Sequence, residues 1–160
     1  MINDIRVGLG YDSHRLGENR KLVLGGIEIP FKKGCIAHSD GDVLLHAIGD
    51  ALLGSLALKD IGTHFPDHDP QYKNMDSRIL VAHIVSLIHR EGWRVHNLDA
   101  SIIAEQPKIA PYVDAITEVL VSLLNIDPGN VSVKAKTNEK LGFIGREEGI
   151  AAMAIVTVTK

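Results

Sequence analysis

The sequence predicts a single α/β domain over residues 1–160, in which a mixed sheet carries helices packed on one face. Segments that look like strands and hairpins alternate with segments of helical period, and this mixture favours such a sandwich. Of the 160 residues, 45% are hydrophobic and only 4% are aromatic, so a mostly aliphatic core is expected. A net charge of -3, without a long run of like charge, argues against a general nucleic-acid surface.

The first part of the chain is expected to form a strand and a hairpin. Residues 5–12 have the pattern of a strand, and Gly8 and Gly10 within it permit close approach of another backbone. Residues 21–30 predict a hairpin, because a Gly-Gly pair at 25–26 can form its turn.

A long apolar helix is expected next. Residues 31–39 are expected to be a loop, and the apolar run that follows predicts a helix over residues 40–58. Ser39 or Asp40 can cap its start, because each offers a side-chain oxygen to free N–H groups. Residues 59–77 are rich in Pro, Asp and Gly and predict a long loop of the kind that often carries function.

The rest of the chain alternates between helical and strand patterns. Helical periods predict helices over residues 77–91 and 111–124. Strand patterns cover residues 93–105, 131–137 and 150–160. The order therefore joins hairpins with helical crossovers.

The single cysteine, Cys35, limits the chemistry that is available. It excludes an internal disulfide and a multi-cysteine zinc site, so a transition metal would need His and Asp or Glu ligands. Cys35 itself is expected to be a small residue of a loop or of the core. The sequence shows neither a secretory leader nor an apolar run long enough to span a bilayer. We expect a protein of the bacterial cytoplasm, or of a plastid if a transit segment has been removed, without membrane or nucleic-acid partners.

The first strand and the apolar helix both carry ionisable residues at regular spacing. Asp12 and His14 point to the same face of a strand, and Asp42, His46 and Asp50 lie on one side of a helix. Together Asp12, His14 and His46 offer three ligands, which is the usual number at a catalytic zinc ion with an open fourth position. The alternatives are a hydrogen-bonded Asp–His pair at the helix start and surface groups at the strand end.

Two more clusters are suited to polar ligands. The loop of residues 60–70 holds Asp60 among other acidic and imidazole groups, and such a loop can wrap a polyhydroxylated ligand. The segment 134–152 places Thr137 and Glu139 among cations and glycines, which suits phosphate oxygens and Mg²⁺. The alternatives are solvated turns started by aspartates and a charged β-turn region.

In combination, these motifs resemble the 2-C-methyl-D-erythritol 2,4-cyclodiphosphate synthase family of the non-mevalonate isoprenoid pathway. The resemblance covers nearly the whole chain and is carried by GYDSHRL, AHSDGDVLLHAIGDALLG, DIGTHFPD, AEQPKIAPY and KTNEKLGFIGREEGIA, in the family's order and spacing. The chain departs from the family at Lys136 and Asn138, where threonines are common, and at Ala110, where a larger apolar residue is frequent.

The resemblance implies a metal-assisted intramolecular phosphoryl transfer. A phosphate oxygen of 4-diphosphocytidyl-2-C-methyl-D-erythritol 2-phosphate attacks the β-phosphorus, CMP leaves, and a cyclic diphosphate forms. No protein nucleophile is required, so positioning and charge neutralisation are expected to dominate catalysis.

The resemblance also implies roles for the matching residues. The metal ligands are Asp12, His14 and His46 for Zn²⁺ and Glu139 for Mg²⁺. His38 and Thr137 are implied to stabilise the transition state. From the helix spacing we expect Asp42 to orient a metal-bound imidazole and Asp50 to serve as a packing or capping partner.

A larger set of residues is implied to contact the substrate. Ser39 would touch the 2-phosphate, residues 60–62 would hold the erythritol hydroxyls, and residues 104–110 would form the cytosine pocket. The full set is Asp12, Ser13, His14, His38, Ser39, Asp60, Ile61, Gly62, Phe65, Pro66, Asp67, His68, Asp69, Ala104, Glu105, Gln106, Pro107, Lys108, Ile109, Ala110, Lys136, Thr137, Asn138, Glu139, Phe143 and Arg146.

The assembly that the resemblance implies is a homotrimer with active sites between neighbouring subunits and a central cavity. Phe143 and Arg146 match residues that line this cavity, where an isoprenoid diphosphate could bind. An isolated chain would then expose a hydrophobic sheet face, and residues 150–158 are expected to contribute to it.

Two other functions could use the same ligands. A zinc-dependent phosphoesterase would transfer the phosphoryl group to water, but it often needs a second metal, for which the sequence offers no obvious ligand set. A structural zinc site in an oligomeric protein would be a closed four-ligand site, usually with cysteine ligands.

Overall fold

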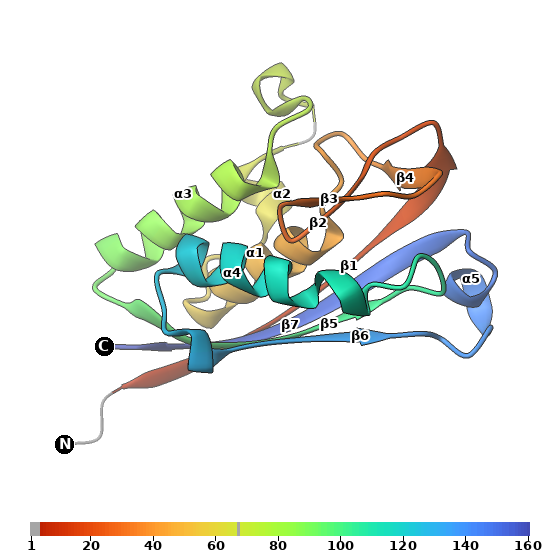
Figure 1. The fold of residues 1–160 in the computed structure, drawn as a ribbon. Coiled ribbons are helices and arrows are strands. Elements are labelled where there is room, and N and C mark those ends of the chain that lie inside the picture. The colour runs from red at the N-terminus through yellow and green to blue at the C-terminus, as the bar shows by residue number, and fades with distance from the viewer. Residues whose placement is uncertain (1–3, 67) are drawn as a thin grey trace.

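The computed structural model describes residues 4–66 and 68–160, and its centre is a five-stranded mixed sheet (Figure 1). The strands are β1 (Ile5–Glu18), β4 (Lys33–Ile36), β5 (Arg94–Ile103), β6 (Val131–Lys136) and β7 (Gly149–Thr159), in the order β4-β1-β7-β5-β6. The β5–β6 pair is parallel and the other neighbours are antiparallel. The sheet is therefore mixed, as the sequence predicts.

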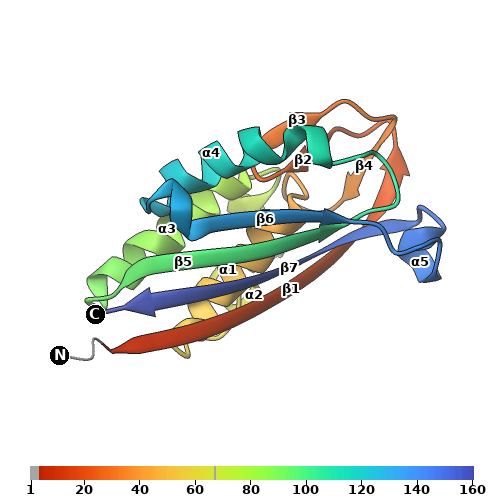
Figure 2. The same cartoon turned by 60° about the horizontal axis from the view of Figure 1, so that its bottom comes forward.

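Three longer helices cover one face of this sheet (Figures 1 and 2). They are α1 (Val43–Ser55), α3 (Ser77–Arg90) and α4 (Val113–Leu124). The short helices are α2 (Ile61–His64), α5 (Gly142–Gly145), η1 (Pro70–Tyr72), η2 (Ala110–Tyr112) and η3 (Pro128–Asn130). None of the described helices has the length and apolar character needed to cross a membrane.

Helix α1 lies directly on the backbone of β1. A Cβ atom at Gly8 would be 1.8 Å from the carbonyl oxygen of Ala51, and one at Gly10 would be 1.8 Å from that of Ala47. No residue with a side chain fits there unless the backbone moves, which confirms the close approach expected from these glycines.

The opposite face of the sheet is uncovered over the part of the chain that the structure describes, and Figure 2 turns this face toward the reader. Its large apolar side chains come from the two adjacent strands β1 and β7. They are Ile5, Val7, Leu9, Tyr11, Met153 and Ile155, each more than two-fifths exposed. Leu9 pairs with Ile155 and Tyr11 with Met153, so the side chains form one continuous strip. The expectation of a hydrophobic exposed face is confirmed.

The predicted hairpin is confirmed. It consists of β2 (Leu22–Leu24) and β3 (Ile27–Ile29), and both glycines of its turn have positive φ. The predicted helices beginning near residues 77 and 111 and the three later strands are also confirmed, with small shifts at their ends.

Four local expectations are wrong or incomplete. The predicted loop 31–39 contains β4, which is only four residues long and gives no periodic signal. Strand β1 continues to Glu18 because β4 and β7 both pair with its polar second half. Helix α1 begins at Val43 with Asp42 as its cap and ends at Ser55. The loop 59–77 contains α2 and η1.

Candidate metal centre and active site

Three ligand atoms meet where β1 passes beneath α1. Asp12 Oδ2 lies 3.0 Å from His46 Nδ1 and 3.2 Å from His14 Nε2, and the two imidazole nitrogens are 3.0 Å apart. In a tetrahedral zinc site with bonds of about 2.0–2.1 Å, neighbouring ligand atoms are about 3.3 Å apart. The donor set therefore fits a divalent metal such as zinc, and the structure brings together the three residues that the sequence singled out.

The packing of α1 on β1 makes this convergence possible. Gly10 contacts Ala47, so Asp12, two residues further along β1, lies below the neighbouring His46. Burial lowers the pKa of His14, partly offset by the charge of Asp12. Burial also acts to lower the pKa of His46, but the hydrogen bond and charge of Asp12 outweigh it, so the net shift is upward. The carboxylate thus balances charge at a partly desolvated site.

Asp42 does not orient a histidine, and that expectation is wrong. Its fully buried carboxylate accepts hydrogen bonds from the backbone N–H groups of Gly25 (3.0 Å), Gly26 (2.7 Å) and Leu45 (3.0 Å). It caps α1 and ties the β2–β3 turn to the helix start. Burial raises the pKa of Asp42 to about 6, although the three N–H donors oppose this shift.

Asp50 anchors the segment that follows α1. Its Oδ1 accepts the N–H of Ile61 at 2.8 Å, which joins α1 to the start of α2 and agrees with the expected capping role. Burial raises the pKa of Asp50. Asp60 caps α2 through the N–H and hydroxyl of Thr63, both at 2.8 Å, and the hydroxyl bond lowers the pKa of Asp60.

The three ligands open into a pocket of about 420 Å³. The predicted site residues that line it are Asp12, His14, His38, Ser39, His46, Ile61, Gly62 and Phe65. Asp50 also lines it, together with residues that the sequence reasoning missed, namely Ile36, Ala37, Tyr72, Met75 and Leu80. Ala37 begins the quoted motif AHSDGDVLLHAIGDALLG, whereas the other four lie outside the quoted motifs, so only the fold places them at the pocket.

Other predicted contacts from these parts of the chain do not line the pocket. Asp60, Pro66, His68 and Asp69 belong to or flank the α2–η1 segment, whereas Asp67 lies outside the described residues. Ser13 is exposed on β1, and its N–H donates to Asp12 Oδ1 at 2.8 Å.

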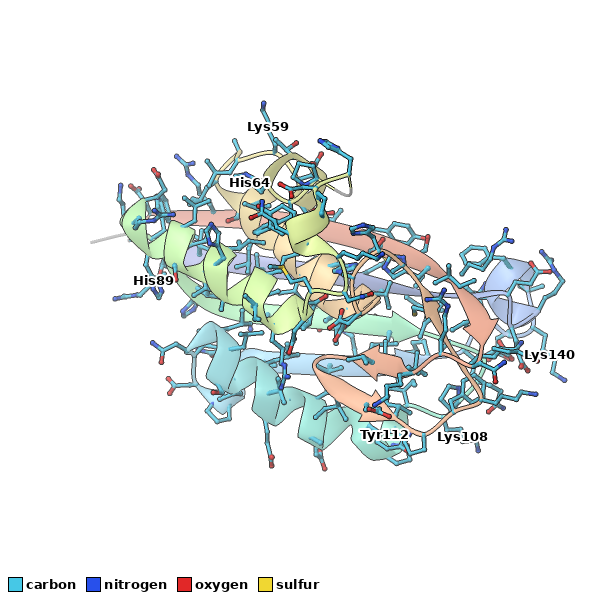
Figure 3. The ribbon with its side chains drawn as sticks, turned by 90° about the horizontal axis from the view of Figure 1, so that it is seen from above. Lys59, His64, His89, Lys108, Tyr112 and Lys140 are labelled. Atoms are coloured by element: carbon cyan, nitrogen blue, oxygen red, sulfur yellow. The ribbon has the colours of Figure 1, made fainter. Side chains whose placement is uncertain are left out.

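The expected nucleotide contacts lie elsewhere in the chain. Residues 104–110 follow β5, and residues 136–139 end and follow β6. Strand β6 is three strand positions from β1, which is about 14 Å at ordinary strand spacing. Figure 3 shows Lys108 and Tyr112 at the opposite edge of the molecule from Lys59 and His64. One chain therefore does not bring both halves of the expected site together.

The two loops of this second region are tied to each other. Glu105 accepts the N–H groups of Asn138 (3.2 Å) and Lys140 (3.3 Å), so this predicted substrate contact also holds the loops in place. Thr137 donates its hydroxyl to Glu139 Oε1 at 2.7 Å, and both side chains are exposed. An exposed carboxylate beside a hydroxyl fits Mg²⁺ held jointly with phosphate oxygens.

Comparisons with known proteins agree on one family. Residues 5–159 match the model of the YgbB family. A protein of Pseudomonas syringae pv. syringae (strain B728a), named 2-C-methyl-D-erythritol 2,4-cyclodiphosphate synthase, is 54% identical over 98% of this chain and 99% of its own length.

Solved structures agree with the sequence comparison. The bifunctional IspDF from Campylobacter jejuni matches with a TM-score of 0.94 and 40% identity over 99% of this chain, which spans 43% of that longer protein. The CDP complex of IspF from Plasmodium falciparum matches with a TM-score of 0.85 and 37% identity, over 99% of this chain and 98% of that one.

Proposed function

The chain belongs to the YgbB family, and we propose that it converts 4-diphosphocytidyl-2-C-methyl-D-erythritol 2-phosphate to 2-C-methyl-D-erythritol 2,4-cyclodiphosphate and CMP. It is then a phosphorus–oxygen lyase of isoprenoid precursor biosynthesis, acting in the cytoplasm. The observation that carries this proposal is the convergence of Asp12, His14 and His46 on one pocket.

The reaction exchanges one phosphorus–oxygen bond for another. An oxygen of the 2-phosphate attacks the β-phosphorus, and the bond from that phosphorus to the oxygen bridging toward the α-phosphate breaks. This oxygen leaves with CMP and keeps the electron pair. Both reacting groups belong to one flexible polyanion. The protein therefore has to hold the substrate in a bent conformation and offset the repulsion between its phosphates, and it does not have to supply a nucleophile.

The metal-binding residues address this repulsion. Asp12, His14 and His46 would hold Zn²⁺, and Glu139 would hold Mg²⁺ together with phosphate oxygens. Bound at these places, the ions would supply positive charge to the diphosphate. Asp12 would offset part of the charge of a bound ion, and the three ligand side chains line the pocket, so a ligand in the pocket could reach the ion.

Residues at the pocket wall would position the reacting phosphate. Ser39 and His38 lie on the lining, where a hydroxyl and an imidazole can donate to the 2-phosphate. Ile61 and Gly62 would hold the erythritol hydroxyls, with Asp60 beside them, and the Asp50–Ile61 hydrogen bond keeps this wall next to the metal ligands.

The nucleotide would be bound by the second region. Residues 104–110 form the cytosine pocket in this proposal, and Lys136 and Thr137 lie at the neighbouring strand end to meet the phosphates. The Plasmodium falciparum relative, whose structure is a complex with CDP, supports a cytidine diphosphate group as part of the ligand.

We also propose a homotrimer whose active sites lie between subunits. Two observations support it: the metal ligands and Glu139 lie in different regions of one chain, and β1 and β7 expose a continuous apolar strip. A neighbouring copy that covers the strip would bring its nucleotide region to the metal pocket.

The central cavity of this assembly would bind an isoprenoid diphosphate. Three cations, Arg15, Lys33 and Arg146, and two acidic residues, Glu147 and Glu148, line a cavity of about 480 Å³ next to α5. Phe143, in α5, is 41% exposed. Arg146 is paired with Glu148, so a diphosphate would compete for this cation. Farnesyl diphosphate titrated into the protein should bind and change the activity, and the absence of both effects would remove this proposal.

A product assay tests the reaction. The purified protein receives the cytidyl substrate with Mg²⁺ and Zn²⁺, and phosphorus NMR follows it beside a His46→Ala control. CMP and a cyclic diphosphate, absent in the control, are the expected products. Free phosphate would indicate the phosphoesterase instead, and untouched substrate with zinc still bound would indicate a structural metal site.

A further inference from the structure

His46 presents its two ring nitrogens to different neighbours. Nδ1 faces Asp12 and His14, whereas Nε2 lies 3.0 Å from the hydroxyl oxygen of Ser77 and 3.1 Å from that of Ser39. Ser77 is the first residue of α3 and is fully buried. The imidazole is therefore held between the metal site and the start of a second helix.

The hydroxyl of Ser77 has a second partner that fixes its direction. It lies 2.5 Å from Asp40 Oδ1, and the N–H of Ser77 donates to Asp40 Oδ2 at 2.9 Å. A carboxylate can only accept, so the single hydroxyl proton of Ser77 goes to Asp40. The oxygen of Ser77 can then only accept a hydrogen bond from His46, and Nε2 must carry the hydrogen.

This assignment determines the other nitrogen. A neutral imidazole has one N–H, so with the hydrogen on Nε2 the lone pair of Nδ1 is left to bind a metal ion that Asp12 and His14 would share. Without a metal, the contact of Nδ1 with Asp12 requires a hydrogen on both nitrogens, in agreement with the raised pKa of His46. We propose that Asp40 and Ser77 form a positioning pair that sets the tautomer and ring orientation of His46 for metal binding through Nδ1. The proposal rests on the zinc site of the proposed function.

Asp40 is itself held in place between two helix starts. Its N–H donates to the carbonyl of Met75 at 3.1 Å, and its Oδ1 accepts the N–H of Asp42 at 3.1 Å. The same two segments share a second backbone bond, from the N–H of Asn74 to the carbonyl of His38 at 2.9 Å. These bonds fix the carboxylate relative to both α1 and α3, which a positioning group requires.

Ser39 has a different situation, although it also lies near Nε2. Its oxygen accepts the N–H of Gly41 at 3.2 Å, and no carboxylate within the described ranges accepts its proton. Its hydroxyl can therefore turn toward a ligand in the pocket. The two serines therefore have different roles: Ser77 positions the metal ligand His46, and Ser39 can contact the substrate.

Zinc affinity gives the first test. Ser77→Ala should weaken binding of Zn²⁺, measured by competition with a chromophoric chelator, by about 10–100-fold, as expected when the partner of a metal-bound histidine is lost. Ser86→Ala is the matched control, because Ser86 lies on the same helix and its hydroxyl donates to the carbonyl of Ala82. The zinc affinity of this variant should equal that of the wild-type protein. Wild-type affinity in a folded Ser77→Ala protein would overturn the proposal.

The tautomer gives a second test, which does not depend on any variant. Nitrogen NMR of the zinc-loaded wild-type protein should show His46 bound through Nδ1, with a slowly exchanging hydrogen on Nε2. Binding through Nε2 would overturn the proposal. In Ser77→Ala this hydrogen should exchange rapidly with water. If the wild-type protein binds no zinc, the proposed function fails as well; if it binds zinc and Ser77→Ala binds it equally, only the positioning pair fails.

Discussion

The two halves of the proposed active site are constructed in opposite ways. The metal half consists of Asp12, His14 and His46, which come from a strand and a buried helix and contact one another directly. The nucleotide half consists of residues 104–110 and 136–139, in loops that leave two adjacent parallel strands. Its hydroxyl and carboxylate are exposed. Its two loops are joined by hydrogen bonds to Glu105 and by the backbone bond from Ala104 to Lys136.

The two halves therefore differ in whether they depend on a second copy of the chain. The metal half is complete within one chain, so metal affinity and local stability should depend on the same side chains. The nucleotide half has its functional groups in place but faces no partner within the described chain. Its contribution should therefore appear in turnover, and only when another copy supplies the metal half.

The largest effect is expected from His46→Ala. It removes one of three ligands, so zinc should be lost, and activity should fall by about 10³-fold or more because several kcal/mol of charge stabilisation disappear. Asp50→Asn is the matched comparison on the same helix, because Asp50 contacts Ile61 and not the metal ligands. Zinc content and product formation measured in both variants should differ strongly, and equal losses would contradict the separation of roles.

Glu139→Gln should lower activity by about 10²-fold, as is typical when one electrostatic contact to the transition state is lost. Zinc content should stay at the wild-type level, because Glu139 belongs to the other half. Glu118→Gln, an exposed acidic residue of α4, controls for the change of surface charge. The rate measured against Mg²⁺ concentration should show a higher requirement only in Glu139→Gln; loss of zinc in this variant would show that the halves are not separate.

Mixing the two defective chains tests whether the halves come from different copies. If each site takes its metal half from one subunit and its nucleotide half from the next, co-refolded His46→Ala and Glu139→Gln chains form some intact sites. Random mixing in equal amounts makes about a quarter of the interfaces complete, so about a quarter of wild-type activity should return. Activity no higher than the average of the separate variants would place both halves in one chain.

The sequence predicted the three metal ligands, but it did not predict the residues that hold His46 in position. The two-residue spacing of Asp12 and His14 already predicts a common face on a strand, and the glycines before them permit close approach of another backbone. The sequence did not indicate that this neighbour is α1. The partners of His46 could not be predicted, because Ser77 lies far along the chain and meets Asp40 only through the docking of α3.

Asp42 shows the limit of spacing arguments. Its position one turn before His46 predicted a contact with the imidazole, but the buried turn of β2–β3 has two N–H groups that need an acceptor, and Asp42 meets them. The short strand β4 was missed for a related reason: its four residues are defined by pairing with β1 and not by their own pattern.

Gly10→Ala should destabilise the fold by about 1–3 kcal/mol, because the added Cβ overpacks the contact between β1 and α1. The new atom would lie 1.8 Å from the carbonyl oxygen of Ala47, and any shift of α1 also moves His46, so zinc affinity should fall too. Gly129→Ala is the control, since a Cβ there meets nothing within 4 Å. Denaturant midpoints should separate the two variants, and equal midpoints would mean that α1 has room to move.

The smallest expected effect concerns two aspartates with the same local role. Asp42 caps α1 and Asp60 caps α2, yet burial raises the pKa of Asp42 to about 6, whereas the hydroxyl of Thr63 lowers the pKa of exposed Asp60. Carbon NMR of the carboxyl groups should show Asp42 titrating above, and Asp60 below, the ordinary value of 3.8.

The two titrations have opposite consequences for stability. The native state binds the Asp42 proton more tightly than the unfolded chain does, so the contribution of Asp42 to the free energy of unfolding is greatest below about pH 4 and falls as the pH rises to about 6. The contribution of Asp60 is present above its ordinary pKa and is lost as the pH falls through its lowered native value. Because both residues cap helices, a common midpoint would mean that water reaches Asp42 and that burial does not separate the two caps.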